Sequence, residues 1–373
     1  MSGIYVHVPF CRRKCLYCAF YSVALLSKKS DYLHALQLDI ENNKSYLSDN
    51  KIDTIYFGGG TPSLLSAEDI KFIYKLIADN FNFSSDYEWT IEANPEQLTD
   101  VYLADLFRLG VNRLSIGVQS FDDDTLHFLG RKHSSEQAFS AVENAVKAGF
   151  ENVSIDLIYG ITQRGKGHWK NDLQKAMALP ISHLSAYALT NEENSLLWRK
   201  IRKGELPELD DELVRDEFFE LLEISRGGGF EQYEISNFAR DGKISRHNFN
   251  YWQQIPYLGV GPSAHSFNGE SRKWNVAQLD TYISALEKGE DPSESESLTI
   301  ENQYDEYVLL QLRTRNGLKF SQIESQFGKS YSQYALRQIE KLNPAHYLHS
   351  DDWLVLTDEG KLFADGIAET LFL

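Results

Sequence analysis

Through about residue 235 the chain alternates between short apolar runs and longer stretches with helical periodicity. The apolar runs predict β-strands at residues 3–8, 52–57, 87–92, 112–117, 153–158 and 182–188. The helical stretches between them are residues 31–47, 67–80, 99–109, 134–149 and 168–178. Ser66 and Thr99 are N-cap residues in this pattern, and Gly110 and Gly149 lie where helices should end. Strict alternation of strand and helix predicts βαβ units and a parallel sheet.

Six strand–helix repeats are too few to close an eight-stranded barrel. The pattern therefore fits either a partial barrel or an open doubly wound sheet, and periodicity does not choose between them. In both architectures the active site lies at the carboxyl ends of the strands.

The pattern changes after about residue 190. Two acidic helical stretches, 192–204 and 210–226, are followed by three glycines and an aromatic-rich region, 230–275. The acidic segment 287–297 is interpreted as a boundary, and the last 75 residues predict helices, a strand at 353–356 and a terminal helix. We therefore expect a barrel domain over 1–235, a connecting region over 236–290 and a small winged-helix-like α+β domain over 291–373.

The overall charge argues against a nucleic-acid partner. Lys and Arg number 37 against 54 Asp and Glu, a formal net charge of −17, which repels phosphate backbones. No run of 18 apolar residues and no secretory signal pattern is found, and a strand-like segment begins at Ile4. We expect a cytoplasmic protein without a transmembrane segment, although peripheral membrane contact is compatible with the sequence.

The three cysteines of the chain, Cys11, Cys15 and Cys18, lie within eight residues. Such clustering argues against a disulfide framework, and thiolates are the ligands that iron–sulfur clusters select. A loop with these spacings could hold three corners of a cubane and leave the fourth iron open to a ligand with an amine and a carboxylate. The basic residues at 12–14 would offset the negative charge of the cluster. The alternatives are unrelated free thiols or a zinc site completed by a histidine such as His7.

Polar residues follow several of the predicted strands. Gly59, Gly60 and Thr61 follow the second strand, and backbone without side chains lets a ligand approach closely. Carboxylates or amides end the next three strands, at Glu92, Gln119 and Asp156. Buried polar groups require partners, which the hydroxyls and amine of a ligand would supply. A tight turn and helix caps are the structural alternatives.

The Cys-x3-Cys-x2-Cys loop after the first strand resembles that of the radical S-adenosylmethionine (SAM) superfamily. This resemblance implies a partial (β/α)6 TIM-like barrel and a [4Fe–4S] cluster on Cys11, Cys15 and Cys18. In that superfamily the cluster reduces SAM to generate a 5′-deoxyadenosyl radical. The glycine-rich turn corresponds to the segment that contacts the methionyl amine of SAM.

Further motifs resemble a narrower family, which contains the oxygen-independent coproporphyrinogen III oxidases and the HemW-type heme chaperones. They are Tyr5-Val6-His7-Val8-Pro9-Phe10-Cys11, the Gly-Gly-Gly-Thr-Pro turn, Gly117-Val118-Gln119-Ser120-Phe121 and Leu129-Gly130-Arg131. By position, the resemblance implies SAM contacts from Tyr5, Gly59, Gly60, Thr61, Glu92, Gln119, Arg131 and Asp156. A solvated surface role is the alternative for Arg131.

Two features favour the chaperone branch. The oxidases have a further cysteine two residues after the third cluster cysteine, where this chain has Phe20. The hexapeptide His247-Asn248-Phe249-Asn250-Tyr251-Trp252 resembles the H-N-x-x-Y-W motif of the chaperones. An imidazole beside aromatic rings suits heme, so His247 is a candidate axial ligand and His265 a second one. The alternative for His247 is a hydrogen-bonded core histidine.

The resemblance thus implies a heme chaperone that binds heme and transfers it to an acceptor protein. A reductant such as flavodoxin or ferredoxin would serve the cluster. The alternative is a coproporphyrinogen dehydrogenase-like oxidoreductase that decarboxylates coproporphyrinogen III. The sequence leaves open whether the chaperone is also an enzyme.

Overall fold

The computed structural model describes residues 2–193 and 195–373. Six parallel strands form the centre of the large sheet: β1 (Ser2–Val8), β2 (Lys51–Gly59), β3 (Asn82–Ala93), β4 (Arg113–Gln119), β5 (Val153–Tyr159) and β6 (His183–Ala188). They lie side by side in chain order. A doubly wound sheet would reverse its strand order at a switch point. The unreversed order therefore identifies a partial barrel.

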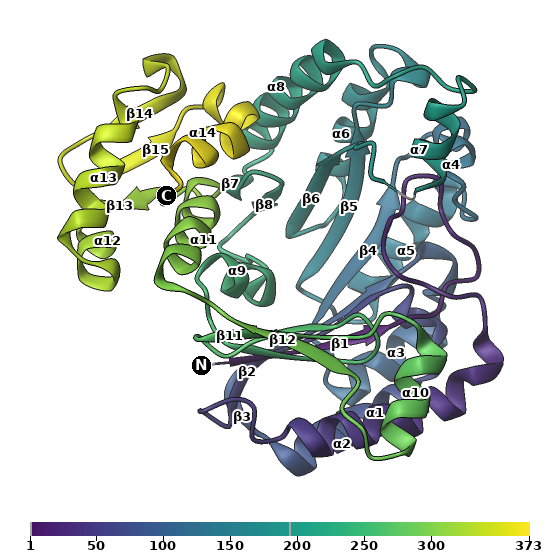
Figure 1. Ribbon diagram of the computed structural model, residues 1–373. Coiled ribbons are helices and arrows are strands. Elements are labelled where there is room, and N and C mark those ends of the chain that lie inside the picture. The colour runs from purple at the N-terminus through teal and green to yellow at the C-terminus, as the bar shows by residue number, and fades with distance from the viewer. Residues whose placement is uncertain (1, 194) are drawn as a thin grey trace.

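Helices cover the outer, convex side of this sheet (Figure 1). They are α1 (Lys29–Asn43), α2 (Ala67–Asn80), α3 (Asp100–Leu109), α5 (Ser135–Lys147), α6 (His168–Ala178) and α8 (Asp211–Gly227). Five of them match predicted helices within a few residues, and α8 matches the stretch 210–226. Helix α2 begins with a capping box, in which Ser66 Oγ accepts from the Asp69 amide and the Asp69 carboxylate accepts from the Ser66 amide.

The aromatic-rich region extends the same sheet at both edges. Strands β8 (Asn237–Ala239) and β7 (Glu231–Glu234) follow β6, while β9 (Tyr257–Val260) pairs in parallel with β1. The antiparallel strands β10 (His265–Phe267), β11 (Ser271–Asn275) and β12 (Ser293–Ser297) complete that edge. The connecting region expected over 236–290 is therefore continuous with the barrel sheet.

The sequence interpretation of segment 287–297 was wrong in one respect. It contains the edge strand β12, whose Ser-Glu-Ser-Glu-Ser sequence is mostly exposed. Charged residues on an edge strand block pairing with further strands, and they also remove the apolar pattern that marks a strand. The helix that precedes it, α10 (Leu279–Glu287), packs on α1.

The C-terminal residues form a smaller domain with its own hydrophobic cluster. It contains α11 (Ile300–Leu312), α12 (Phe320–Phe327), α13 (Lys329–Ile339), α14 (Ala364–Leu371) and a sheet of β13 (Leu318–Lys319), β15 (Trp353–Leu356) and β14 (Tyr347–His349). Gln311 Nε2 donates to the Trp252 carbonyl at 2.6 Å, and the Arg313 guanidinium lies 5.7 Å from the Trp252 ring centre. These contacts attach the domain beside the open side of the barrel (Figure 1).

The short helices α4 (Asp123–Leu129) and α9 (Arg246–Trp252) were not predicted, because seven residues are too few to establish a helical period. A third short helix, α7 (Leu196–Arg202), lies within the predicted stretch 192–204. Within residues 2–193 and 195–373, no helix combines the length and apolar character needed to cross a bilayer.

Candidate functional site

The cysteine loop begins directly after β1 and is anchored at two points. The Cys11 amide donates to the Val23 carbonyl and the Leu16 amide donates to the Leu129 carbonyl, each at 3.0 Å. All three thiols are half-buried. Burial first, and the neighbouring thiols as well, raise the pKa of Cys18, so its thiolate needs a cation to stabilise it.

The donor set fits a cluster better than a single ion. Within the described residues, no three His, Cys, Asp or Glu side chains are arranged to hold one metal ion. Zinc would need four ligands about 2 Å from one point, whereas a cubane presents its corners to thiols that lie farther apart. Three thiolates are the donor set of a [4Fe–4S] cluster with one open iron, whereas a structural zinc site takes four protein ligands.

The glycine turn after β2 packs directly against the cysteine loop. A side-chain carbon at Gly60 would lie 2.6 Å from the Phe10 carbonyl oxygen, and Gly59 has a φ of +104°. Thr61 Oγ1 lies 3.4 Å from Cys11 Sγ. Glycine is therefore required where the end of β2 meets the cluster loop.

Two partly buried carboxyl groups lie close together beside this turn. Glu92 Oε1 accepts from the Tyr56 hydroxyl at 2.8 Å, and its Oε2 accepts from the Gly59 amide at 3.2 Å. Burial raises the pKa of Glu92 to about 7, and Asp156 adds to that rise. Burial likewise raises the pKa of Asp156, although Ser115 Oγ donates to it at 3.2 Å. A cationic group of a ligand would stabilise both carboxylates.

Arg131 connects the cluster loop to the ends of β3 and β4. Its Nη2 donates to Asn94 Oδ1 at 2.6 Å and to the Gly117 carbonyl at 2.7 Å, and Nη1 lies 3.7 Å from Cys15 Sγ. The side chain is therefore held at the site, and the surface alternative does not describe it. Its proximity to Cys15 suits stabilisation of a thiolate.

The remaining predicted positions also lie in this region. Gln119, at the end of β4, is buried and has a φ of 68°, and its amide nitrogen lies close to Gly117. The Tyr5 hydroxyl lies 3.2 Å from His7 Nδ1 on the same strand. The fold brings the predicted SAM residues to one end of the barrel, and their individual contacts to SAM stay predictions.

Sequence reasoning missed three residues of the site. Arg113 is 1% exposed at the start of β4, and its charge lowers the pKa values of Glu92 and Asp156, partly offsetting burial. Tyr56 and Asn94 hold Glu92 and Arg131. The position of Asn94 directly after β3 was a usable signal. Arg113 lay inside the predicted strand 112–117, where a single polar residue gave no such signal.

His247 lies in α9 as a buried, hydrogen-bonded residue. Its Nδ1 is 2.8 Å from Thr54 Oγ1, its Nε2 is 2.8 Å from the Tyr251 hydroxyl, and its ring stacks on Tyr56 at 5.1 Å. Burial lowers its pKa to about 3. Both ring nitrogens are engaged, so in this arrangement His247 offers none to an iron, and the core-histidine alternative describes its environment.

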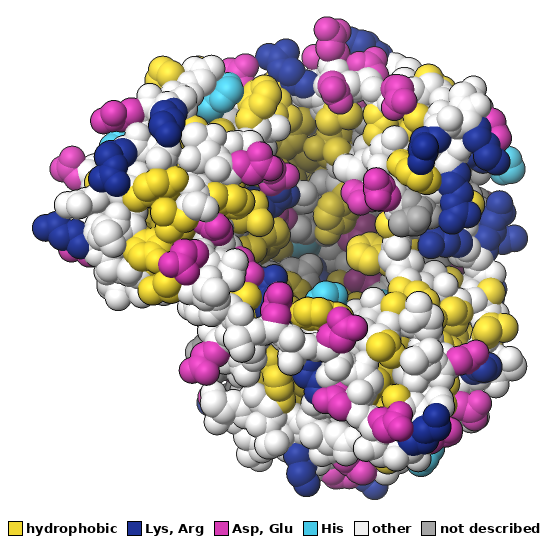
Figure 2. Space-filling view, viewed as in Figure 1, with side chains coloured by type: hydrophobic (Ala, Val, Ile, Leu, Met, Phe, Trp, Pro, Cys, Tyr) yellow, Lys and Arg dark blue, Asp and Glu magenta, His cyan; other side chains and the backbone are white. Residues whose placement is uncertain are grey.

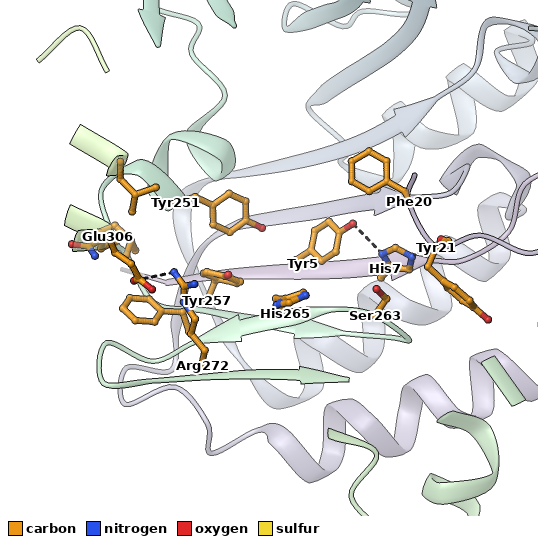
Figure 3. Close-up of a pocket in the computed structure, with 14 residues that line it drawn as sticks. Tyr5, His7, Phe20, Tyr21, Tyr251, Tyr257, Ser263, His265, Arg272 and Glu306 are labelled. Carbon is orange, nitrogen blue, oxygen red and sulfur yellow. Dashed lines mark hydrogen bonds and ion pairs between the residues drawn. The ribbon is translucent and has the colours of Figure 1, made fainter. Parts of the chain in front are cut away.

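A cavity of about 390 Å³ lies between the barrel and the C-terminal domain. Figure 2 shows the molecule hollowed between these parts, and Figure 3 shows the side chains around the cavity. It extends from Phe20, two residues after Cys18, to Leu310 in α11. Six of its fourteen lining residues are Tyr or Phe: Tyr5, Phe20, Tyr21, Tyr251, Tyr257 and Phe267.

Known protein families match both the barrel and the C-terminal domain. Residues 5–176 match the radical SAM superfamily, and residues 298–363 match the HemN C-terminal domain. The superfamily match spans the cysteine loop and the ends of β1–β5. Members of that superfamily carry a [4Fe–4S] cluster and SAM.

Curated relatives match over almost the full length. The heme chaperone HemW of Bacillus subtilis is 34% identical, with 98% of each chain covered. The heme chaperone HemW of Mycobacterium tuberculosis is 35% identical and covers 99% of this chain and 94% of its own. Among solved structures, the coproporphyrinogen III oxidase HemN of Escherichia coli shares the fold, with a TM-score of 0.86, 24% identity and coverage of 100% of this chain and 90% of its own. The chain therefore belongs to the radical SAM superfamily, within the family that contains the HemW-type heme chaperones.

Proposed function

We propose that this protein is a heme chaperone: it binds heme and transfers it to an acceptor protein, and it carries a [4Fe–4S] cluster and SAM. The full-length similarity to curated heme chaperones is the observation that carries the proposal. The aromatic cavity supports it independently, because flat aromatic walls suit a porphyrin.

Different residues of the chain would bind the cluster and SAM. Cys11, Cys15 and Cys18 would hold the cluster, with Arg131 beside Cys15. Glu92 and Asp156 would accept the amine and ribose hydroxyls of SAM. When bound, the cluster and SAM supply one-electron chemistry at the end of the barrel. Phe20, two residues after Cys18, lines the cavity, so the proposed heme site begins next to the cluster loop.

The surface near the cluster indicates the kind of reductant. Arg12, Arg13 and Lys14 are exposed in a chain whose net charge is −17. A local basic surface attracts acidic partners. We therefore propose that a small acidic redox protein, such as flavodoxin or ferredoxin, reduces the cluster from this side, and that the protein works in the cytoplasm.

An anaerobic assay separates the chaperone from a coproporphyrinogen III oxidase. The reconstituted protein receives coproporphyrinogen III, SAM and a reductant, and a parallel sample receives heme alone. We expect a stable heme complex and no protoporphyrinogen IX. Repeated turnover to protoporphyrinogen IX would contradict the proposal and assign the oxidase.

A further inference from the structure

Three histidines lie at or beside the aromatic cavity, and two of them have both ring nitrogens engaged. His247 contacts Thr54 and Tyr251. His7 contacts the Tyr5 hydroxyl through Nδ1 at 3.2 Å and the Tyr21 carbonyl through Nε2 at 3.3 Å. For His265, no hydrogen bond to its ring is found within residues 2–193 and 195–373. Of these three imidazoles, only that of His265 has ring nitrogens available to a ligand.

His265 is exposed to the cavity and fixed in place. Figure 3 shows its ring on the cavity wall, below Tyr5 and between Ser263 and Tyr257. It stacks on Trp274 of the neighbouring strand, with ring centres 6.2 Å apart.

The turn before His265 is held rigidly from beneath. Buried Asp39 of α1 accepts from the Gly261 amide at 2.9 Å, from Asn275 Nδ2 at 3.0 Å and from the Tyr282 hydroxyl at 2.7 Å. These bonds join the turn to α1, β11 and α10. Because the turn is already ordered, His265 loses less conformational entropy when it binds a metal.

One end of the cavity is lined by an arginine side chain. Arg272 Nη2 pairs with Glu306 Oε2 of α11 at 2.9 Å, and both side chains line the cavity. Arginine binds carboxylates through paired donors. A planar ligand with a metal centre and carboxylates at one edge would thus meet an imidazole, aromatic faces and a guanidinium in one cavity.

We propose that His265 is the protein ligand to the heme iron and that heme lies in this aromatic cavity with its propionates toward Arg272. The inference rests on the proposed function and refines it, since it moves the iron ligand from His247 to His265. In this reading His247 is a positioning residue, which fixes the Tyr251 hydroxyl at the cavity wall.

The test titrates ferric heme into the full, anaerobically reconstituted protein and follows the Soret band and the electron paramagnetic resonance of the iron. Wild type is compared with His265→Ala, with His247→Gln and with the control His34→Ala, which changes an exposed histidine on α1. We expect His265→Ala to lose the nitrogen-ligated spectrum and to bind at least about tenfold more weakly. His34→Ala should keep the wild-type spectrum and affinity. His247→Gln removes the support of the Tyr251 hydroxyl, so it should bind heme more weakly but with the nitrogen-ligated spectrum of wild type.

Chemical rescue separates loss of a ligand from loss of structure. Free imidazole, added to His265→Gly at a concentration that leaves protein-free ferric heme unligated, should restore both the nitrogen-ligated spectrum and the tight saturable complex. Protein-free heme with the same imidazole is the control, and a misfolded cavity would not restore the affinity. If His265→Ala keeps the wild-type spectrum and affinity, or if only His247→Gln loses them, the assignment of His265 is wrong and the chaperone proposal stands. If wild type forms no saturable heme complex, both proposals are wrong.

Discussion

The chemistry around the cluster loop depends on individual charges. The three thiols lie in one short loop, and Arg131 holds a guanidinium 3.7 Å from Cys15 Sγ. A thiolate ligand cannot be replaced by a methyl group, because soft sulfur donors bind the iron. The cysteines could be identified from sequence because three thiols in eight residues are conspicuous by themselves.

Cys15→Ala should abolish the cluster. After anaerobic reconstitution we expect loss of the sulfur-to-iron charge-transfer absorbance and of bound iron. Lys44→Ala, an exposed change outside the loop, is the control and should keep the absorbance. Full cluster occupancy in Cys15→Ala would refute the ligand set.

Glu92 should make the SAM-free protein less stable as the pH rises. Burial raises its pKa from 4.5 to about 7, so the folded state holds a proton that the unfolded state releases. The free energy of unfolding therefore falls between about pH 4.5 and pH 7, by at most about 3 kcal/mol. Urea unfolding at pH 5 and pH 7.5 should show a smaller difference in Glu92→Gln than in wild type. Glu68→Gln, at an exposed position in α2, should behave like wild type. Equal pH dependence in all three would contradict the assignment.

Single-residue roles were less predictable where the partner is distant in sequence. His247 was a candidate iron ligand because its hexapeptide resembles the H-N-x-x-Y-W motif of the heme chaperones. Its partner Thr54 is 193 positions away, so the hydrogen bond that occupies Nδ1 is invisible in the sequence. Arg113 was missed for a similar reason, since its burial depends on how β4 lies within the barrel.

At the scale of elements, one buried carboxylate fixes the turn that carries His265. In Asp39→Asn the amide donor must face either the Gly261 amide and the Tyr282 hydroxyl or, if the side chain is turned over, Asn43 Nδ2, which donates to the other carboxylate oxygen at 2.7 Å. Unpaired buried donors cost about 1–3 kcal/mol. We expect a lower free energy of unfolding by about that amount in urea, together with weaker heme binding. Asp31→Asn, exposed on the same helix, should change neither. Unaltered stability in Asp39→Asn would show that the turn does not need this support.

The alternating elements were predictable because helical and strand periods differ along the barrel half of the chain. Strands β1–β6 and helices such as α2, predicted at 67–80, follow that pattern closely. Prediction failed for α9 and β12. The first is too short for its period to show, and the second alternates serine and glutamate on an exposed edge.

At the scale of the whole molecule, the C-terminal domain contributes to the cavity through Glu306. Its carboxylate occupies Arg272, which a heme propionate would also need. Partly exposed ion pairs contribute about 0–1 kcal/mol, so removing this competitor should strengthen heme binding up to about fivefold. Heme titration of Glu306→Gln tests this, with the exposed Glu301→Gln on the same helix as control. Weaker binding in Glu306→Gln would contradict competition for Arg272.

The most direct test of the whole account is the stoichiometry of heme on the reconstituted wild-type protein. The titration is followed anaerobically by the Soret band, with iron and sulfide measured in the same sample. The account predicts saturation at one heme per chain while the cluster on Cys11, Cys15 and Cys18 stays intact. Absence of a saturable complex, or loss of the cluster when heme binds, would contradict it.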